Sequence, residues 1–265
     1  MLTKPLTNED AARIDAMDVH VIVPQQGFTI SAASPGVGVA MGGGLIGAII
    51  DSSMQSSAQR GMRADLVNFY NRVQGFDFQA EVGKTLAGPM PAMPFKVQDY
   101  RLREITLRSG EQDQAVTATA KGPAYVRLQT AYGVDAALER FTVSSFVVIW
   151  QNGRKEESYK GHLVSHVRIP AGTRDEKLAF LEKNDNGFLR EETARAVTQL
   201  FSMLSLDLNE RARPAGAATP EAKDNFEIPG MPGIKHRGHR IGVMQGAVVW
   251  RSAAGVLHSV PQEAS

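Results

Sequence analysis

The middle third of the sequence is a succession of short runs rich in β-branched and aromatic residues, with turn signals between them. Lys121-Gly122-Pro123 and Gln151-Asn152-Gly153 are the two strongest of these signals. Apolar and polar residues alternate along 125–132, a pattern typical of a strand with one buried and one solvated face. We expect strands at 97–107, 115–120, 125–132, 141–150 and 159–169. Because short turns join them in succession, they predict an antiparallel meander.

Two long helices are expected to flank this meander. The first covers Asp51–Leu86, because its apolar residues fall at helical spacing around Phe69 and Val73. The second covers Asp175–Leu208, with a split at Asn184–Gly187. Near the N-terminus we expect a short helix at 8–17 and then a strand at 19–23, which residues 28–32 extend.

The predicted fold class is therefore α+β, with the antiparallel β meander flanked by two long helices. A Gly-rich apolar segment precedes the first helix, and a Pro-rich linker and a C-terminal β-hairpin follow the second. We expect a core domain at 1–208, a linker or arm at 209–235, and the hairpin at 236–265, packed on the core. The hairpin strands are expected at 240–250 and 256–260.

The Gly-rich segment, Gly36–Ile50, contains no charged residue. Small residues recur at every fourth position, and on a helix they form a smooth stripe that lets a partner approach closely. With Gly47 added, the candidate membrane or oligomer contact residues are Gly36, Ala40, Gly44, Gly47 and Ala48. A buried structural element is the equal alternative. A dinucleotide-binding loop is disfavoured, because the glycine spacing departs from the fingerprint and Ser31–Pro35 separates it from the strand.

Composition narrows the function classes. The net charge is +1, which gives no large basic surface, so nucleic acid is not expected as a partner. The chain has no cysteine, which excludes disulfides, thiol nucleophiles and Cys-based zinc sites. The first residues lack the build of a signal peptide, so we expect either no export by that route or a signal that was removed.

No catalytic, cofactor or metal site is predicted. No serine lies in a G-x-S-x-G or S-x-x-K motif. His162 and His166 are four residues apart on a predicted strand, about 13 Å at ~3.3 Å per residue, too far to share a zinc ion. His236 and His239 lie among Lys and Arg residues, which disfavours a cation site. The basic run 235–240 is expected to be a solvated turn rather than an anion site.

The sequence resembles Gram-negative envelope lipoproteins of poorly defined function. The resemblance rests on KPLT at 4–7, VHVIVPQ at 19–25, GGGLIGAIIDSSMQSSAQR at 42–60, RLQTAYGVDAALERFTVSS at 127–145 and GVLHSVP at 255–261. In element order the chain is more distantly similar to lipoproteins of curli-type secretion channels and transport accessory proteins. The resemblance implies a location in the periplasm or outer membrane. The family's signal peptide and acylated cysteine are absent from this sequence.

Two functional hypotheses follow. The first is a non-enzymatic envelope protein that acts through self-association or membrane contact of Gly36–Ile50, with a homo-oligomer or an envelope protein as its partner. The second is a soluble small-ligand-binding or enzymatic α+β domain, with a deep pocket lined by the meander and the second long helix. No cofactor is expected in either case. A third possibility is a subunit of a ring or filament, with residues 209–233 lying on a neighbour.

Overall fold

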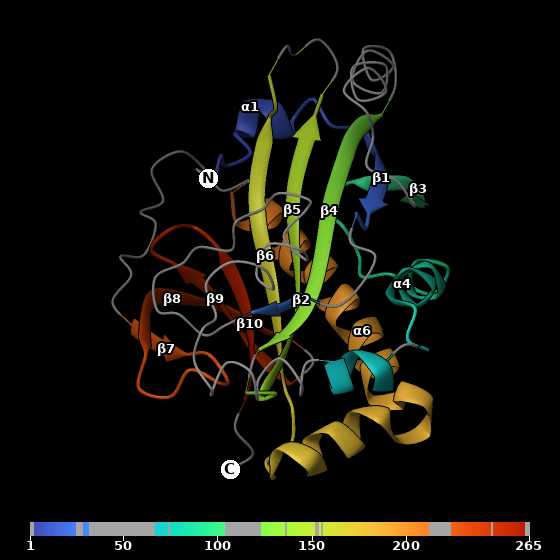
Figure 1. Cartoon of the computed structure of the whole chain (residues 1–265). Helices are drawn as coiled ribbons and strands as arrows, with labels where there is room; N and C mark the ends of the chain where they lie inside the picture. The colour runs from blue at the N-terminus through green and yellow to red at the C-terminus, as the bar shows by residue number, and fades with distance from the viewer. Residues whose placement is uncertain are drawn as a thin grey trace, which may run out of the picture.

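The computed structural model describes residues 3–24, 29–31, 67–73, 75–103, 123–135, 137–151, 154, 156–211, 224–244 and 246–262 (Figure 1). Its helices are α1 (Asn8–Ala11), α4 (Phe78–Leu86) and α6 (Arg174–Arg211), with a further helical turn at 67–72. Its strands are β1 (Ala16–Ile22), β2 (Thr29–Ser31), β3 (Lys96–Arg103), β4 (Ala124–Asp135), β5 (Arg140–Trp150), β6 (Tyr159–Arg168), β7 (Asp224–Glu227), β8 (Lys235–Met244), β9 (Ala247–Ser252) and β10 (Leu257–Pro261).

These strands form one mixed sheet, and the predicted antiparallel meander is wrong as the organising motif. The order is β3-β1-β4-β5-β6-β10-β9-β8-β7, and β2 pairs with β4 outside this path. Of the strands predicted for the meander, β4, β5 and β6 are the ones that pair in antiparallel succession. β1 lies between β3 and β4 and is parallel to both, and β10 is parallel to β6. Turn signals report connections between neighbours in sequence, so they could not indicate these long-range parallel pairings.

The position of β1 follows from its residues. Six of its seven residues are buried, so both faces of the strand are covered. Burial on both faces is typical of a central strand in a parallel arrangement. The helix expected at 8–17 is shorter, because α1 ends at Ala11 and β1 begins at Ala16. Thr7 caps α1 by accepting a hydrogen bond from the Asp10 backbone amide (3.0 Å).

The prediction of two long flanking helices is also wrong. Within the described residues α6 is the one long helix, and it lies close to the predicted range 175–208. Its backbone is non-helical at 183–186, which coincides with the expected split. Of the first predicted helix, 51–66 lies outside the described residues. The remaining part of the predicted helix, 67–86, is interrupted at 73–77. There the Phe76 amide donates to the Val73 carbonyl oxygen in a turn, and Asp77 caps the separate helix α4.

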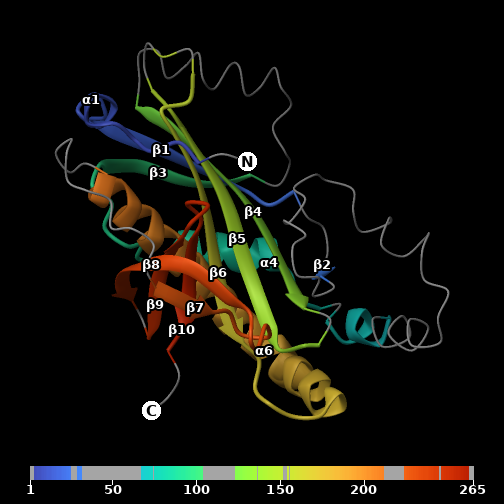
Figure 2. The ribbon, with the colours of Figure 1, turned by 90° about the vertical axis from the view of Figure 1, so that its left-hand side faces the viewer.

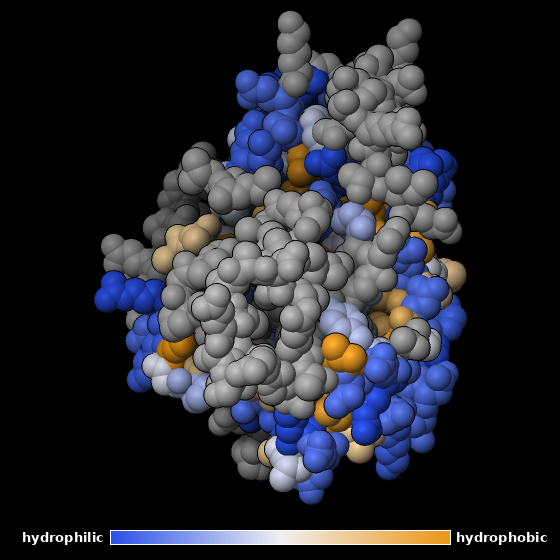
Figure 3. Space-filling view, viewed as in Figure 1, coloured by the Kyte–Doolittle hydropathy of each residue, from blue (hydrophilic) through white to orange (hydrophobic). Residues whose placement is uncertain are grey.

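α6 and α4 lie on one face of the sheet (Figures 1 and 2). α6 contacts β5, β6, β8 and β10, and α4 contacts both α6 and β3. The main core lies between these layers and is built from side chains such as Leu163, Leu181, Leu200 and Phe201. Among the described residues seen from the opposite side, hydrophilic side chains predominate (Figure 3). No helix in the described ranges combines the length and apolar character needed to span a membrane.

The C-terminal part of the chain adds three strands rather than the two-stranded hairpin that we expected. The predicted strand 240–250 is interrupted by a turn with Gly246 at φ +75°, which separates β8 from β9. β8, β9 and β10 are successive antiparallel neighbours, and β7 pairs with the far edge of β8. The segment expected as a linker thus contributes β7 to the sheet. Its residues 212–223 lie outside the described part.

Candidate functional site

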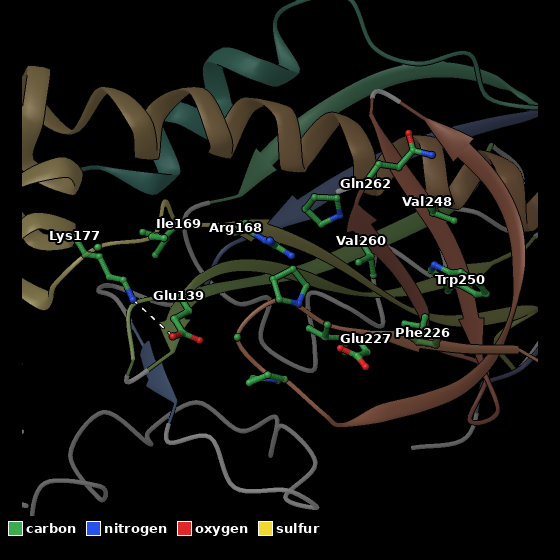
Figure 4. A pocket seen from close by; sticks show the side chains of 17 residues that line it. Glu139, Arg168, Ile169, Lys177, Phe226, Glu227, Val248, Trp250, Val260 and Gln262 are labelled. Atoms are coloured by element: carbon green, nitrogen blue, oxygen red, sulfur yellow. Dashed lines mark ion pairs between the residues drawn. The ribbon is translucent and has the colours of Figure 1, made fainter. Parts of the chain in front are cut away.

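A groove of about 920 Å³ lies where the C-terminal strands meet the end of β6 and the start of α6 (Figure 4). One wall comes from the turn before β5, the end of β6 and the first turn of α6. The other wall comes from β7, the loop after it, β9 and β10. The lining residues are Glu139, Arg168, Ile169, Ala171, Gly172, Lys177, Phe226, Glu227, Ile228, Pro229, Gly230, Pro232, Val248, Trp250, Val260, Pro261 and Gln262.

The wall on the C-terminal strands is apolar and aromatic. The rings of Phe226 and Trp250 stack at 5.2 Å with an interplanar angle of 11°. Phe226, Ile228 and Val260 form a small buried cluster against which Trp250 packs. These side chains come from β7, β9 and β10, so strand pairing within the C-terminal part of the sheet fixes this wall. Trp250 is its half-buried member, and an aromatic wall of this kind is common in small-molecule sites.

The opposite wall carries the charged groups. Glu139 and Lys177 form an ion pair at 3.8 Å, and Lys177 also donates to the carbonyl oxygen of Ala137 (3.2 Å). The side chain of Arg168 extends toward the centre of the groove between the two walls (Figure 4). The groove is therefore charged at one end and apolar at the other, and Glu227 lies on the apolar side.

A tight turn before β5 positions Glu139 and anchors the opposite loop. The Asp135 carboxylate accepts hydrogen bonds from the backbone amides of Glu139 (2.7 Å) and Arg140 (3.3 Å). Arg140 in turn donates to the carbonyl oxygen of Pro229 (3.1 Å), in the loop after β7. Burial raises the pKa of Asp135 and lowers the pKa of Arg140. This turn thus ties the two walls together across the groove.

The groove spans a narrow junction in the sheet, which we call the seam. At the seam only three residue pairs join β6 and β10: Leu257–Leu163, His258–Val164 and Ser259–Ser165. By comparison, ten pairs join β4 to β5 and ten join β5 to β6. The charged wall belongs to the β6 side of the seam, and the aromatic wall belongs to the β10 side.

On the helix-covered face, side chains of α6 bridge the seam. Gln199 Oε1 accepts hydrogen bonds from Ser165 on β6 (2.7 Å) and Ser259 on β10 (3.1 Å). Two turns further along, Asp207 accepts from the Tyr159 hydroxyl on β6 (2.6 Å) and pairs with Arg251 on β9 (2.7 Å). All of these side chains are buried. α6 therefore holds both sides of the seam on this face.

On the other face, two histidines meet across the seam. His166 Nε2 lies 3.1 Å from His258 Nδ1, and the two rings are parallel within 6° at 5.4 Å. Burial lowers the pKa of His258 to about 3 and holds the pKa of His166 well below its usual value. Phe226 of the groove lies 5.4 Å from His258, so the histidine pair adjoins the aromatic wall.

The predicted contact residues Gly36, Ala40, Gly44, Gly47 and Ala48 all lie outside the described residues. His162 and His166 lie on strand β6, as expected, and each stacks on a different ring: Phe146 for His162 and His258 for His166. In the residues that the structure covers, no group of three His, Cys, Asp or Glu side chains can hold a metal ion.

The basic run 235–240 is the first part of strand β8 rather than the turn that we expected. His236 packs against Phe226, and His239 is buried. None of the groove residues was singled out from the sequence. Their only sequence signal is a proline-rich loop beside aromatic residues, and that signal does not reveal which wall the loop will face.

Comparisons with known proteins add little. No protein-family model matches the sequence, and no curated protein matches it. One solved structure, described as that of an uncharacterized protein, is similar over 76% of this chain and 95% of its own, with 12% identity and a TM-score of 0.27. A similarity this weak supports no inference about the fold or the function.

Proposed function

We propose that the protein binds a small amphipathic molecule in the groove between β6 and the C-terminal strands. The observation that carries the proposal is the pairing of a stacked aromatic wall with a charged wall in one cavity of about 920 Å³. This volume falls in the range typical of small-molecule sites, which are mostly apolar with a few polar groups that orient the ligand.

The walls suggest how such a ligand would lie. Its apolar body would pack on Phe226 and Trp250, and its polar end would reach Arg168 and the Glu139–Lys177 pair. The Asp135–Arg140 turn and the Pro229 loop preform the cavity, because their hydrogen bonds fix both walls before any ligand enters. A preformed site binds more tightly than one that must become ordered on binding.

The test uses anilinonaphthalene sulfonate, a fluorescent probe with an aromatic body and an anionic head. We expect saturable binding to the wild-type protein at a single site. Val248→Trp should fill the apolar wall and weaken binding by about tenfold or more, because the added ring occupies the space that the probe needs. The matched control is Val67→Trp at a position 53% exposed and outside the groove lining, which should leave binding unchanged.

A second variant tests the charged end. Arg168→Gln should weaken binding of the sulfonate probe by about fivefold and leave binding of uncharged phenylnaphthylamine unchanged, because only the sulfonate gains from a guanidinium. Circular dichroism establishes that each variant is folded. Equal binding to the Val248→Trp and Val67→Trp proteins would contradict the proposal.

The hypothesis drawn from Gly36–Ile50 stays a prediction, because the segment lies outside the described residues. It concerns self-association or membrane contact, a homo-oligomer or an envelope partner, and a location in the periplasm or outer membrane. The groove proposal does not depend on it, because none of the groove residues belongs to that segment.

A further inference from the structure

The two faces of the seam are held in different ways. On the helix face, the Gln199 amide and two serine hydroxyls bridge β6 and β10, and none of these groups titrates near neutral pH. On the opposite face, the bridge is the pair of His166 and His258, which is the residue type that titrates closest to neutral pH. Between these two bridges, the ladder that joins β6 and β10 consists of only three residue pairs.

The charges that act on the histidine pair are positive. Arg140 reaches the pair from the start of β5, His162 from the same face of β6, and His236 from β8. β7 contributes the uncharged ring of Phe226, which lies 5.4 Å from His258. By strand alternation, Arg168 and Arg240 also lie on this face. Arg168 follows two residues after His166, and Arg240 pairs with Trp250, which is opposite His258.

The acidic residues nearest the histidine pair either have hydrogen-bond or ion-pair partners or are exposed to solvent. Asp135 accepts backbone hydrogen bonds in its turn, and Glu139 pairs with Lys177. Asp224 and Glu227 on β7 are exposed to solvent. A proton added to the histidine pair would therefore create a positive charge among other positive charges. When both rings are protonated, neither ring has an acceptor nitrogen, so the hydrogen bond between them is lost.

The direction of the pH effect follows from this environment. With the seam closed, the pKa of His258 is lowered to about 3 and that of His166 is also well below its usual value. With the seam open, both rings are solvated and return toward about 6.5. The open form therefore binds more protons, and acidification below about pH 6.5 favours it by up to tenfold per histidine for each pH unit.

We propose that His166 and His258 make the seam sensitive to protons, so that mild acid separates β10 from β6 and opens the groove. The release of a ligand on acidification rests on the proposed function, whereas opening of the seam does not. Because the groove walls lie on opposite sides of the seam, separation of β10 from β6 moves the aromatic wall away from the charged wall.

Trp250 reports the opening without any ligand. In a Trp150→Phe background it is the only tryptophan of the chain, and it lies opposite His258 in the β9–β10 pairing. We expect its acrylamide quenching constant to rise about threefold between about pH 7 and pH 5, before far-ultraviolet circular dichroism changes. His258→Gln should move this transition to lower pH by about one unit or abolish it, because one titrating group is removed.

His20→Gln is the matched control, because His20 is also a buried histidine on a strand but lies on β1, which is not adjacent to the seam. Its transition should stay within a few tenths of a pH unit of the parent. His166→Asn serves as the second seam variant if His258→Gln does not fold. An unchanged transition in a folded seam variant overturns the proposal, and so does quenching that rises only together with global unfolding.

The probe separates the two proposals. If anilinonaphthalene sulfonate binds at neutral pH and leaves in step with the Trp250 transition, both hold. If Trp250 reports the transition but Val248→Trp has no effect on the probe, the seam proposal holds and the groove function fails. If the probe binds in the groove with the same affinity across the Trp250 pH range, the seam proposal fails alone.

Discussion

Gly230 occupies the tightest point of the loop that follows β7. Its backbone is in the left-handed region at φ +75°, and a β-carbon added there would lie 2.4 Å from Asp135 Oδ2 and 3.2 Å from the β-carbon of Glu139. Asp135 is buried and holds the turn that positions Glu139, so it cannot yield without disturbing the groove. A glycine is thus required at position 230 for two reasons: the left-handed backbone, and the lack of space for a β-carbon beside Asp135 and Glu139.

We predict that Gly230→Ala lowers the free energy of unfolding by about 3 kcal/mol, from left-handed strain and overpacking together. Gly233→Ala provides the control, because Gly233 has φ +77° but nothing within 4 Å of an added β-carbon. It should lose only the backbone part, about 1 kcal/mol. Urea denaturation measures both values. Equal losses would mean that the contact with Asp135 does not matter.

At the scale of single residues, the sequence excludes a shared metal site more readily than it identifies which residues contact each other. The spacing of His162 and His166 on a strand correctly separated them, because alternation and residue rise are local properties. The partner of His166 is His258, 92 positions away, and nothing in one sequence links these two positions. Gly230 had no distinguishing signal either, since its role depends on Asp135 from a different part of the chain.

Helix α6 acts as the support that joins both sides of the seam. Asp207 is 2% exposed, and it pairs with Arg251 of β9 while accepting the hydroxyl of Tyr159 on β6. Removing either partner of a buried ion pair leaves the other charge buried without compensation. Gly161 makes this arrangement possible, because an added β-carbon would lie 2.2 Å from the Tyr159 hydroxyl, so the Tyr159 ring lies over Gly161.

We predict that Asp207→Asn destabilises the protein by about 3 kcal/mol, because Arg251 would keep its charge in a buried site without a carboxylate. Tyr159→Phe removes one hydrogen bond and should cost about 1 kcal/mol. Glu182→Gln breaks the exposed pair with Arg72 and should change stability by less than about 0.5 kcal/mol. Chemical denaturation compares the three variants. A loss for Asp207→Asn no larger than that for Glu182→Gln would show that α6 does not depend on this contact.

Strands and helices could be predicted from the sequence where the pattern that indicates them is local. Alternation placed β4, β5 and β6 close to their observed bounds, and Asn184–Gly187 correctly indicated the interruption of α6, where three consecutive residues have positive φ. Which strands pair with each other could not be predicted from the sequence. The run around Val19 indicated a strand but not that it would lie between β3 and β4, because long-range pairing depends on how the whole core closes.

The complete molecule combines two sets of strands in one continuous sheet. β1 to β6 include the three strands of the meander, β7 to β10 form the C-terminal set, and the short β6–β10 ladder connects them. The groove, the histidine pair and the α6 bridges all lie at this connection. The two proposals made above therefore concern a single region, where a small relative shift of the two sets would change the shape of the cavity.

Gly36–Ile50 adds a prediction about assembly that concerns the whole protein. Small residues at every fourth position allow close helix contact, and Gly44 lies in the middle of that stripe. Gly44→Leu should therefore disrupt self-association or membrane partition while the sheet stays folded, because a bulky side chain prevents the backbones from approaching. The control is Val37→Leu, a change at an apolar position between the small residues of the stripe.

Light scattering coupled to size exclusion, with and without detergent, measures the mass of each variant, and circular dichroism monitors the sheet. A defined oligomer, or aggregation that detergent relieves, in the wild type and in Val37→Leu but not in Gly44→Leu would support contact through this segment. A monomer that behaves identically in all conditions would contradict it and favour the buried alternative. In that case Gly44→Leu should instead lower the unfolding free energy by about 1–3 kcal/mol, because a packed interior does not accept the added volume. Mass and stability therefore distinguish the two roles within one pair of variants.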